Sequence, residues 1–403
     1  MRKIIHPLIR FYLKVTSYFF FEKIEIIGKE NMPLDCPVIL ASNHPNAFLD
    51  SIVMTSCAGR PLFYTARGDF FKSKIASTLL YYIQILPVFR IEEGKENLHK
   101  NEETFSYCID ILKENGAVSI FSEGFSENKW ELRPLRKGTA RLAFEAWNNP
   151  EVSDKLRIVP VIIHYSSWLK MFPRVYVEFL ENIEKKSFTS WEEPGIFNKQ
   201  FNEKLKDILS RKCIAVDENS DAATQNKIIG FLLKNATKGA TTAKKLQDKY
   251  LLPGSEIFKV NYKALSEFLT RGNINYDSKS GTSIGTILLL LPTCLLFIVA
   301  WIYNFIPYLL SKFIAWIITK GNDFHDSLMY CSLMLLYPIY LVILFYFSVH
   351  YSSLWTGIEN LVIALISAHF YESSKRTTWS FWKRKKLIIV RQMFSRLFET
   401  NNG

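Results

Sequence analysis

One short stretch of the chain combines a histidine with a carboxylate in a way that could support proton transfer. Residues 41–50 read ASNHPNAFLD, so five residues separate His44 from Asp50. Six positions along an ideal α-helix turn a side chain through roughly 600°, so the two cannot meet on one helix face. We expect His44 in a loop and Asp50 in a helix, with the chain folding the imidazole back. The carboxylate would then hold one imidazole nitrogen and leave the other to remove a proton from a hydroxyl. The alternative is an ordinary helix entry with a surface histidine.

Apolar runs on both sides of this stretch predict how it is positioned. Residues 37–40 (PVIL) indicate a short buried strand, and residues 51–58 indicate a helix. Pro45 favours a break between them, because the residue before a proline is pushed out of the α region and proline suits the first helical turn. The histidine is therefore expected at a strand-to-helix loop, where α/β folds aim side chains into a cleft.

Strand and helix patterns alternate over the first half of the chain. This alternation predicts an α/β domain with a mixed sheet flanked by helices. Strands are expected at residues 24–27, 37–40, 62–65, 87–89, 117–121, 157–164 and 174–179, and helices at 51–58, 71–82, 97–113 and 136–147.

Three further segments follow the histidine in order, each expected at a strand end: PVFR at 87–90, FSEGFS at 121–126 and VPV at 159–161. Together with NHPNAFLD, this set resembles the four motifs of the glycerolphosphate and lysophospholipid acyltransferase family, which acylates glycerol-3-phosphate or 1-acylglycerol-3-phosphate. The resemblance covers residues 24–179.

The resemblance implies a role for each matching residue. His44 would be the general base and Asp50 would orient it, while the proline of the last segment would shape the acyl-donor site. The residues implied to bind a phosphate-bearing acceptor or the donor are Arg90, Glu123, Gly124, Ser126 and Pro160. Arg67, Arg136 and Lys137 could add positive charge, because cationic side chains match phosphate oxygens. Each has a plainer interpretation as a solvated charge, a turn or a strand residue.

Two departures from the family pattern affect these expectations. The family usually places four residues between histidine and aspartate, and the five found here resemble a subgroup that includes fungal-type glycerol-3-phosphate acyltransferases. The glutamate of the third motif normally follows a proline, and here it follows Ser122. The first departure leaves the acceptor open, and the second removes a rigid residue from the turn.

Charge and hydropathy are divided unevenly along the chain. The net charge of +12 would suit nucleic acid or an anionic membrane surface, and the long uncharged runs favour the membrane over nucleic acid. No Asp, Glu, Lys or Arg occurs between Lys279 and Lys312 or between Asp326 and Glu359. Each run exceeds the ~20 residues that cross a bilayer. The six cysteines show no metal-ligand spacing, which indicates a reducing, cytoplasmic setting.

These patterns predict five regions. Residues 1–22 form an amphipathic helix, either in the membrane interface or packed on the domain. Residues 23–180 are the acyltransferase domain, 181–280 a helical extension with helices near 201–209, 227–234 and 240–251, and 281–371 transmembrane and interfacial helices. Residues 372–403 are a basic cytoplasmic tail. Within the fourth region we predict spans at 284–306 and 328–348. Residues 361–371 form either an interfacial helix or part of a third crossing, and we predict that they lie at the surface, because a cytoplasmic domain and a cytoplasmic basic tail require an even number of crossings.

The sequence thus predicts a membrane-bound O-acyltransferase with its active site on the cytoplasmic face. It would move a fatty acyl group from acyl-CoA or acyl-carrier protein to glycerol-3-phosphate or a lysophospholipid, without a metal or redox cofactor. The alternatives are an acyltransferase for a lyso-aminolipid without phosphate and a non-catalytic lipid-binding scaffold. A serine hydrolase is disfavoured, because no nucleophile elbow is expected: the one G-x-S-x-G match, at residues 281–285, opens the first long apolar run and does not follow a predicted strand.

Overall fold

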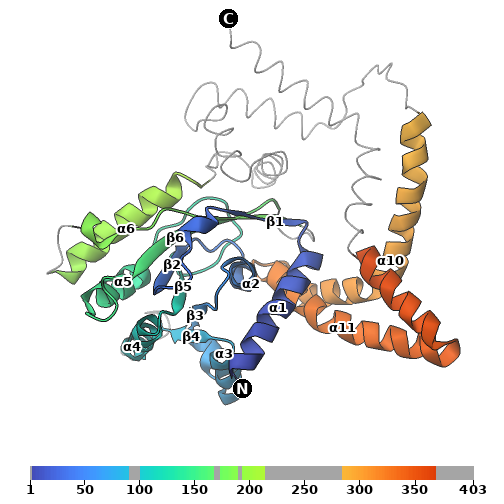
Figure 1. Ribbon diagram of the computed structural model, residues 1–403, viewed down its shortest axis with the longest axis horizontal. Helices are drawn as coiled ribbons and strands as arrows, with labels where there is room; N and C mark the ends of the chain where they lie inside the picture. The colour runs from blue at the N-terminus through green and yellow to red at the C-terminus, as the bar shows by residue number, and fades with distance from the viewer. Residues whose placement is uncertain (1, 90–99, 168–172, 189–192, 214–283, 369–403) are drawn as a thin grey trace, which may run out of the picture. The chain divides into compact units, whose positions relative to one another are not determined.

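The structure is a computed structural model that describes residues 2–89, 100–167, 173–188, 193–213 and 284–368. The chain divides into two compact units, Met1–Lys249 and Tyr250–Gly403, and each is described by itself. The first unit holds the sheet, and the second holds long helices (Figure 1).

Seven strands form one sheet in the first unit, in the order β1-β7-β6-β2-β5-β3-β4. The β6–β7 pair is antiparallel, and the other neighbouring strands are parallel. The predicted mixed sheet flanked by helices is therefore confirmed. The strands are β1 (Lys23–Ile27), β2 (Val38–Ser42), β3 (Phe63–Arg67), β4 (Ile85–Val88), β5 (Ala117–Phe121), β6 (Arg157–Tyr165) and β7 (Arg174–Phe179).

The three central strands are almost continuously buried. Every residue of β2 and β5 is buried, as is every residue of β6 after Arg157. Strands covered on both faces need apolar residues at every position, which explains why these segments do not alternate. Their carboxyl ends lie at the same edge of the sheet, because β6, β2 and β5 run parallel.

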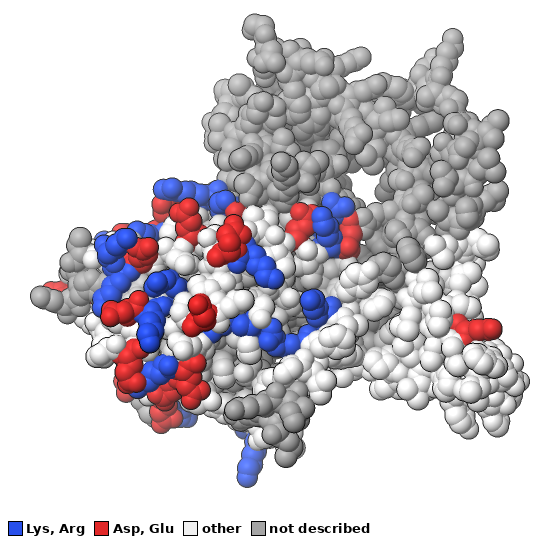
Figure 2. Space-filling view, viewed as in Figure 1, with Lys and Arg blue, Asp and Glu red and all other residues white. Residues whose placement is uncertain are grey.

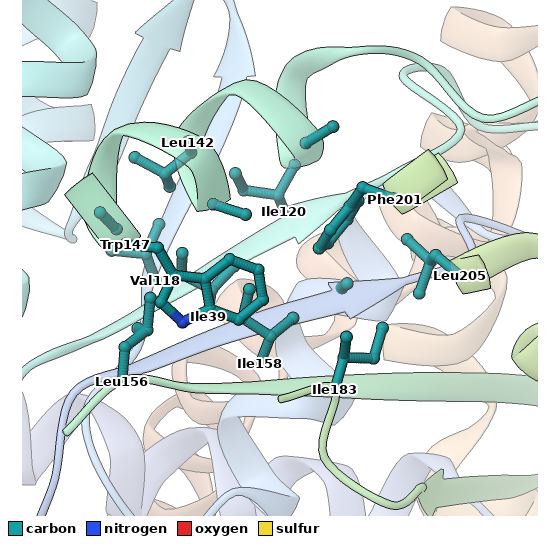
Figure 3. Packing of buried hydrophobic residues seen from close by; sticks show 14 of the residues in the cluster. Ile39, Val118, Ile120, Leu142, Trp147, Leu156, Ile158, Ile183, Phe201 and Leu205 are labelled. Atoms are coloured by element: carbon teal, nitrogen blue, oxygen red, sulfur yellow. The ribbon is translucent and has the colours of Figure 1, made fainter. Parts of the chain in front are cut away.

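Helices cover both faces of the sheet (Figure 1). The helices are α1 (Arg2–Phe20), α2 (Ala47–Cys57), α3 (Lys74–Tyr82), α4 (Lys100–Lys113), α5 (Gly138–Asn148) and α6 (Pro194–Ser210). On one face, α4, α5 and α6 pack against the strands. Figure 3 shows Leu142 and Trp147 of α5 and Phe201 and Leu205 of α6 over the central strands.

Helix α6 belongs to this core, which moves the domain boundary. Phe197 and Phe201 are fully buried, and their ring centroids lie 6.1 and 6.2 Å from that of Trp147. The sheet domain thus extends at least to Cys213, past the boundary predicted at residue 180, because aromatic residues of the predicted extension complete its core. The helices predicted at 227–234 and 240–251 lie outside the described residues.

Helix α1 has two different faces. One side packs on α2, where Ser17 Oγ lies 3.3 Å from Ser56 Oγ. The other side leaves Leu8, Phe11 and Tyr18 more than half exposed. The helix therefore packs on the domain, which was one of the two predictions. It also has the exposed apolar face that the other prediction, a position in the membrane interface, requires.

The second unit contains two helices long and apolar enough to cross a bilayer: α10 (Ile284–Thr319) and α11 (His325–Tyr351). The first predicted span ends at residue 306, but the helix continues to Thr319. A shorter apolar helix, Leu354–Ala368, packs along α10 and α11 instead of lying apart from them, as a surface position for residues 361–371 would imply. Residues 369–403, and with them the predicted basic tail, lie outside the described residues.

Candidate active site

The predicted histidine–aspartate pair forms in the structure. His44 lies in the loop after β2, Asp50 lies in the first turn of α2, and His44 Nδ1 is 2.8 Å from Asp50 Oδ2. Asp50 is completely buried, whereas the His44 side chain is 16% exposed. Because a carboxylate oxygen accepts, the imidazole donates from Nδ1, which leaves a lone pair on Nε2 that could accept a proton. One face of the imidazole stacks on Phe121, with ring centroids 3.9 Å apart.

Two further donors hold the Asp50 carboxylate. The Asn46 backbone N–H donates to Oδ2 at 2.8 Å, and the Tyr165 hydroxyl donates to Oδ1 at 2.8 Å. Tyr165 is itself fully buried at the end of β6, and its carbonyl accepts from Trp130 Nε1 at 2.8 Å. The carboxylate is thus fixed from three directions, which fixes the imidazole in turn.

The helix entry shows how a spacing of five residues still brings the pair together. Ala47, the first residue of α2, has φ +43°, and the N-cap residue Asn46 has φ −147°. A left-handed residue is uncommon outside glycine and costs about 1 kcal/mol or more. Here it turns the start of the helix so that Asp50 faces the loop. Pro45 lies two residues ahead of the helix, not in its first turn as predicted.

The Asn43 side chain fixes the loop to the neighbouring strand. Its Nδ2 donates to the Ile163 carbonyl at 3.0 Å, and its Oδ1 accepts from the Ile163 N–H at 2.8 Å. These bonds continue the β2–β6 pairing beyond Ser42, where the backbone ladder ends. The histidine therefore begins from a fixed backbone position.

Glu123 fixes the His44 backbone from the other neighbouring strand. Its Oε2 accepts from the His44 N–H at 2.7 Å, and its Oε1 accepts from the Arg133 N–H at 2.8 Å. The Arg133 guanidinium pairs with the same carboxylate and also donates to the His44 carbonyl at 2.7 Å. Both side chains are over 90% buried, and their charges offset each other. With both oxygens engaged by the protein, Glu123 positions the histidine loop, and it does so although Ser122 replaces the rigid proline.

Gly124 forms the turn after β5 in a conformation that requires glycine. Its φ is +77°, and a Cβ there would lie 2.7 Å from Arg136 Cγ. The next residue, Phe125, stacks under the guanidinium groups of Arg133 and Arg136, 4.6 and 5.9 Å from its ring centroid. Phe125 thus contacts two arginine side chains, the buried Arg133 and the exposed Arg136.

The other predicted site residues lie at varying distances from the pair. Lys137 is exposed at the N-cap of α5, and Ser126 is half-buried after the Gly124 turn. Arg67, at the end of β3, pairs with Asp69 at 2.6 Å. Pro160 is buried inside β6 opposite Ala41, not at a strand end as predicted. Arg90 lies outside the described residues.

Two site residues were not predicted from the sequence. Arg133 lies ten positions beyond Glu123, and no local pattern links the two. Tyr165 directly follows a predicted strand, but its contact with Asp50 depends on the order of the strands in the sheet, which no local pattern gives. Of the side chains in the described part of the chain, no group of three His, Cys, Asp or Glu could hold a metal ion.

Comparison with known proteins shows what the domain is similar to. Residues 23–164 match the family model described as acyltransferase. The chain is 26% identical over 143 residues to the chloroplastic 1-acyl-sn-glycerol-3-phosphate acyltransferase LPAT1 of Arabidopsis thaliana, which is 35% of this chain and 38% of the relative. It is 35% identical over 83 residues to glycerol-3-phosphate O-acyltransferase 2 of Saccharomyces cerevisiae, which is 21% of this chain and 11% of the relative. The crystal structure of the 1-acyl-sn-glycerophosphate acyltransferase PlsC from Thermotoga maritima aligns at 18% identity with a TM-score of 0.36, over 50% of this chain and 79% of that one.

The histidine–aspartate pair thus joins the loop after a central parallel strand to the first turn of the helix that follows. It lies within residues 23–164, the segment that matches the acyltransferase family model, and the relatives of this segment are named as 1-acyl-sn-glycerol-3-phosphate and glycerol-3-phosphate acyltransferases. The matched segment spans about two fifths of the length of the plant relative.

Proposed function

We propose that this protein is a membrane-bound O-acyltransferase that transfers a fatty acyl group from acyl-CoA or acyl-carrier protein to a hydroxyl of glycerol-3-phosphate or a lysophospholipid. The observation that carries the proposal is the 2.8 Å contact between His44 Nδ1 and the buried Asp50 carboxylate in a domain of the acyltransferase family. The active site faces the cytoplasm in this proposal.

The geometry supports a direct transfer with His44 as general base. Nε2 takes the proton of the acceptor hydroxyl as its oxygen attacks the thioester carbonyl. The tetrahedral intermediate then expels the thiolate, the carbon–sulfur bond breaks, and the proton passes from the imidazolium to sulfur. Asp50 stabilises the imidazolium between these two steps, and its three donors keep it in place without protonating it.

The start of α5 supports binding of a phosphate beside this base. Arg136 and Lys137 are exposed directly before the helix, and the N-cap residue makes no side-chain capping bond. Cations at a helix N-terminus are unfavourable unless an anion shares the site, because the helix dipole is positive there. A bound phosphate would interact favourably both with the two cationic side chains and with the N-terminus of α5. In this proposal Arg90, Ser126 and Pro160 also contact the acceptor or donor, as the family resemblance implies.

Two parts of the structure favour an enzyme over a scaffold or a hydrolase. The Asp50 carboxylate and the His44 backbone each have several buried hydrogen bonds that a mere lipid-binding protein would not need. Ser122 Oγ lies 3.0 Å from Thr139 Oγ1 in a buried position, so it is engaged away from the imidazole.

The test is an assay of purified full-length protein with glycerol-3-phosphate and lysophosphatidate, each combined with acyl-CoA and acyl-carrier protein. His44→Ala should abolish transfer with every pair, whereas His6→Ala, a histidine on α1 that stacks on Tyr82, should keep it. Near-normal turnover by His44→Ala, in protein that still folds and binds membranes, would overturn the mechanism. Lys137→Ala and Arg90→Ala should mainly raise the KM for the acceptor. An unchanged KM in both would indicate an acceptor without phosphate, such as a lyso-aminolipid.

A further inference from the structure

The helices of the second unit direct apolar side chains outward and polar side chains inward, which is the reverse of a helical bundle in water. Their exposed side chains are large and apolar, and they include Ile302, Ile306 and Leu309 on α10, Ile339, Val342 and Ile343 on α11, and Val362, Ile363 and Ile366 on the Leu354–Ala368 helix. In Figure 2 charged side chains gather over the sheet domain, while the visible surface of α10 and α11 is almost uncharged. A surface of this extent, on candidate spans of 25 residues (Leu295–Thr319) and 27 residues (His325–Tyr351), matches hydrocarbon better than water.

Polar side chains of the same helices point inward and bond to one another. Tyr337 Oη of α11 donates to Asn304 Oδ1 of α10 at 2.6 Å and approaches the Ala364 carbonyl at 3.3 Å. Asn304 Nδ2 donates to Ser367 Oγ at 3.0 Å. A single cluster therefore ties all three helices together, which is how membrane helices use the few polar groups they carry.

A second set of bonds lies nearer the turn that joins α11 to the short helix. Tyr303 Oη donates to Asn360 Oδ1 at 2.6 Å, and Asn360 Nδ2 donates to Ser348 Oγ at 2.9 Å. Gly357 lets the helices approach closely here, because a Cβ at this position would lie 2.6 Å from Val349 Cγ2. The short helix is thus packed along its length, from Gly357 to Ser367.

The residues at this turn are typical of those that lie at a membrane interface. Tyr351 and Trp355, which flank it, are 78% and 73% exposed, and aromatic residues of this kind gather at the headgroup level. Ser353 Oγ caps the short helix by accepting from the Thr356 N–H at 3.2 Å. The exposed Glu359 lies only about 8 Å along the helix from its start, which is within reach of the headgroups.

We infer that the Leu354–Ala368 helix enters the lipid bilayer as a third inserted helix, starting at the interface where α11 ends and reaching about 20 Å into the membrane. In this arrangement the helix contacts α10 and α11 on one side and lipid on the other. This inference does not depend on the proposed function. It differs from the prediction that residues 361–371 lie at the surface, which rested on the shortness of the apolar run and on an even number of crossings, and which could not include the polar partners on α10 and α11.

The test is a depth measurement on the full-length protein in liposomes. Single cysteines are placed at successive positions from 355 to 367, labelled with a nitroxide, and their depth is read from collisions with oxygen and with a water-soluble relaxation agent. Cys36, Cys294 and Cys331 are first replaced by serine. Cys57 and Cys108 can remain, because burial raises the pKa of each to about 12 and leaves a thiol that does not react at neutral pH; Cys213 is buried as well.

An inserted helix gives a depth that increases steadily by up to about 1.5 Å per residue, or roughly 12 Å between positions 358 and 366. Positions 342, 343 and 347 on α11 serve as the matched series on a helix of spanning length. A helix lying at the surface would instead give a depth that oscillates every 3.6 residues about a constant mean, and this would overturn the inference. Strong contact with the water-soluble agent at 363 and 366 would overturn it too, because it would place the apolar face in water.

Discussion

Removal of one hydroxyl group, in Tyr165→Phe, probes how the base is held. Tyr165 donates one of the three hydrogen bonds that reach the Asp50 carboxylate, at 2.8 Å and without solvent access. A hydrogen bond to a charged group contributes about 1.5–3 kcal/mol. Since Asp50 keeps its bonds from His44 and Asn46, only part of that amount should be lost from the transition state, and about 1.4 kcal/mol corresponds to a tenfold change in rate. We expect kcat to fall about tenfold, which is less than the ~100-fold to 10,000-fold loss expected when a base is removed.

The loss should lie in kcat and not in the KM for the acceptor, because the Tyr165 hydroxyl contacts the aspartate and not a substrate. Steady-state kinetics with saturating donor measure both constants, together with thermal unfolding of the purified protein.

Tyr64→Phe is the matched control for this variant. Tyr64 is also a buried tyrosine, but its hydroxyl bonds to Thr55 Oγ1 and to the Ser51 carbonyl at 2.8 and 2.9 Å instead of to the carboxylate. It should lose stability to a similar extent and keep the parental kcat. The reasoning fails if Tyr165→Phe has the parental kcat in a protein whose activity still requires His44, or if the control lowers kcat equally.

Three more substitutions test the support of the site. Gly124→Ala should destabilise the domain by about 1–3 kcal/mol, because the residue has φ +77° and the new methyl would lie 2.7 Å from Arg136 Cγ. An unchanged temperature of thermal unfolding would contradict this. Arg133→Met leaves the buried Glu123 carboxylate without its countercharge and should lower the free energy of unfolding by about 3–5 kcal/mol. Denaturant unfolding in detergent measures this, and a decrease below about 1 kcal/mol would show that the pair is dispensable. Asn43→Ala removes both bonds that continue the sheet beyond β2 and should lower kcat more than it raises KM, since it displaces the base and not a substrate contact; the opposite split in steady-state kinetics would refute it.

Local patterns were sufficient for the order of elements and for the central pair. Every strand from β1 to β7 lies within two residues of its prediction at its start, because each is a short apolar run bounded by polar or turn residues. The contact between His44 and Asp50 could also be predicted, since the helix geometry allows only a fold-back across the loop. These features depend on neighbours in the sequence.

The supports of the pair could not be predicted in the same way. Tyr165 lies 115 positions from Asp50, and Arg133 lies 89 positions from His44. Which strands are neighbours decides which of these side chains meet, and the sheet order brings β2 between β5 and β6. A one-dimensional pattern contains no information on that order.

The sequence by itself thus determined the alternating elements, the acid–base pair and the apolar character of the C-terminal helices. Only the tertiary structure decided that Glu123 holds the histidine loop, that Tyr165 anchors the aspartate, and that the Leu354–Ala368 helix bonds to α10 and α11. The physical reason is the same in each case: a buried polar group must find a partner, and the partner is chosen by packing between distant segments, not by spacing along the chain.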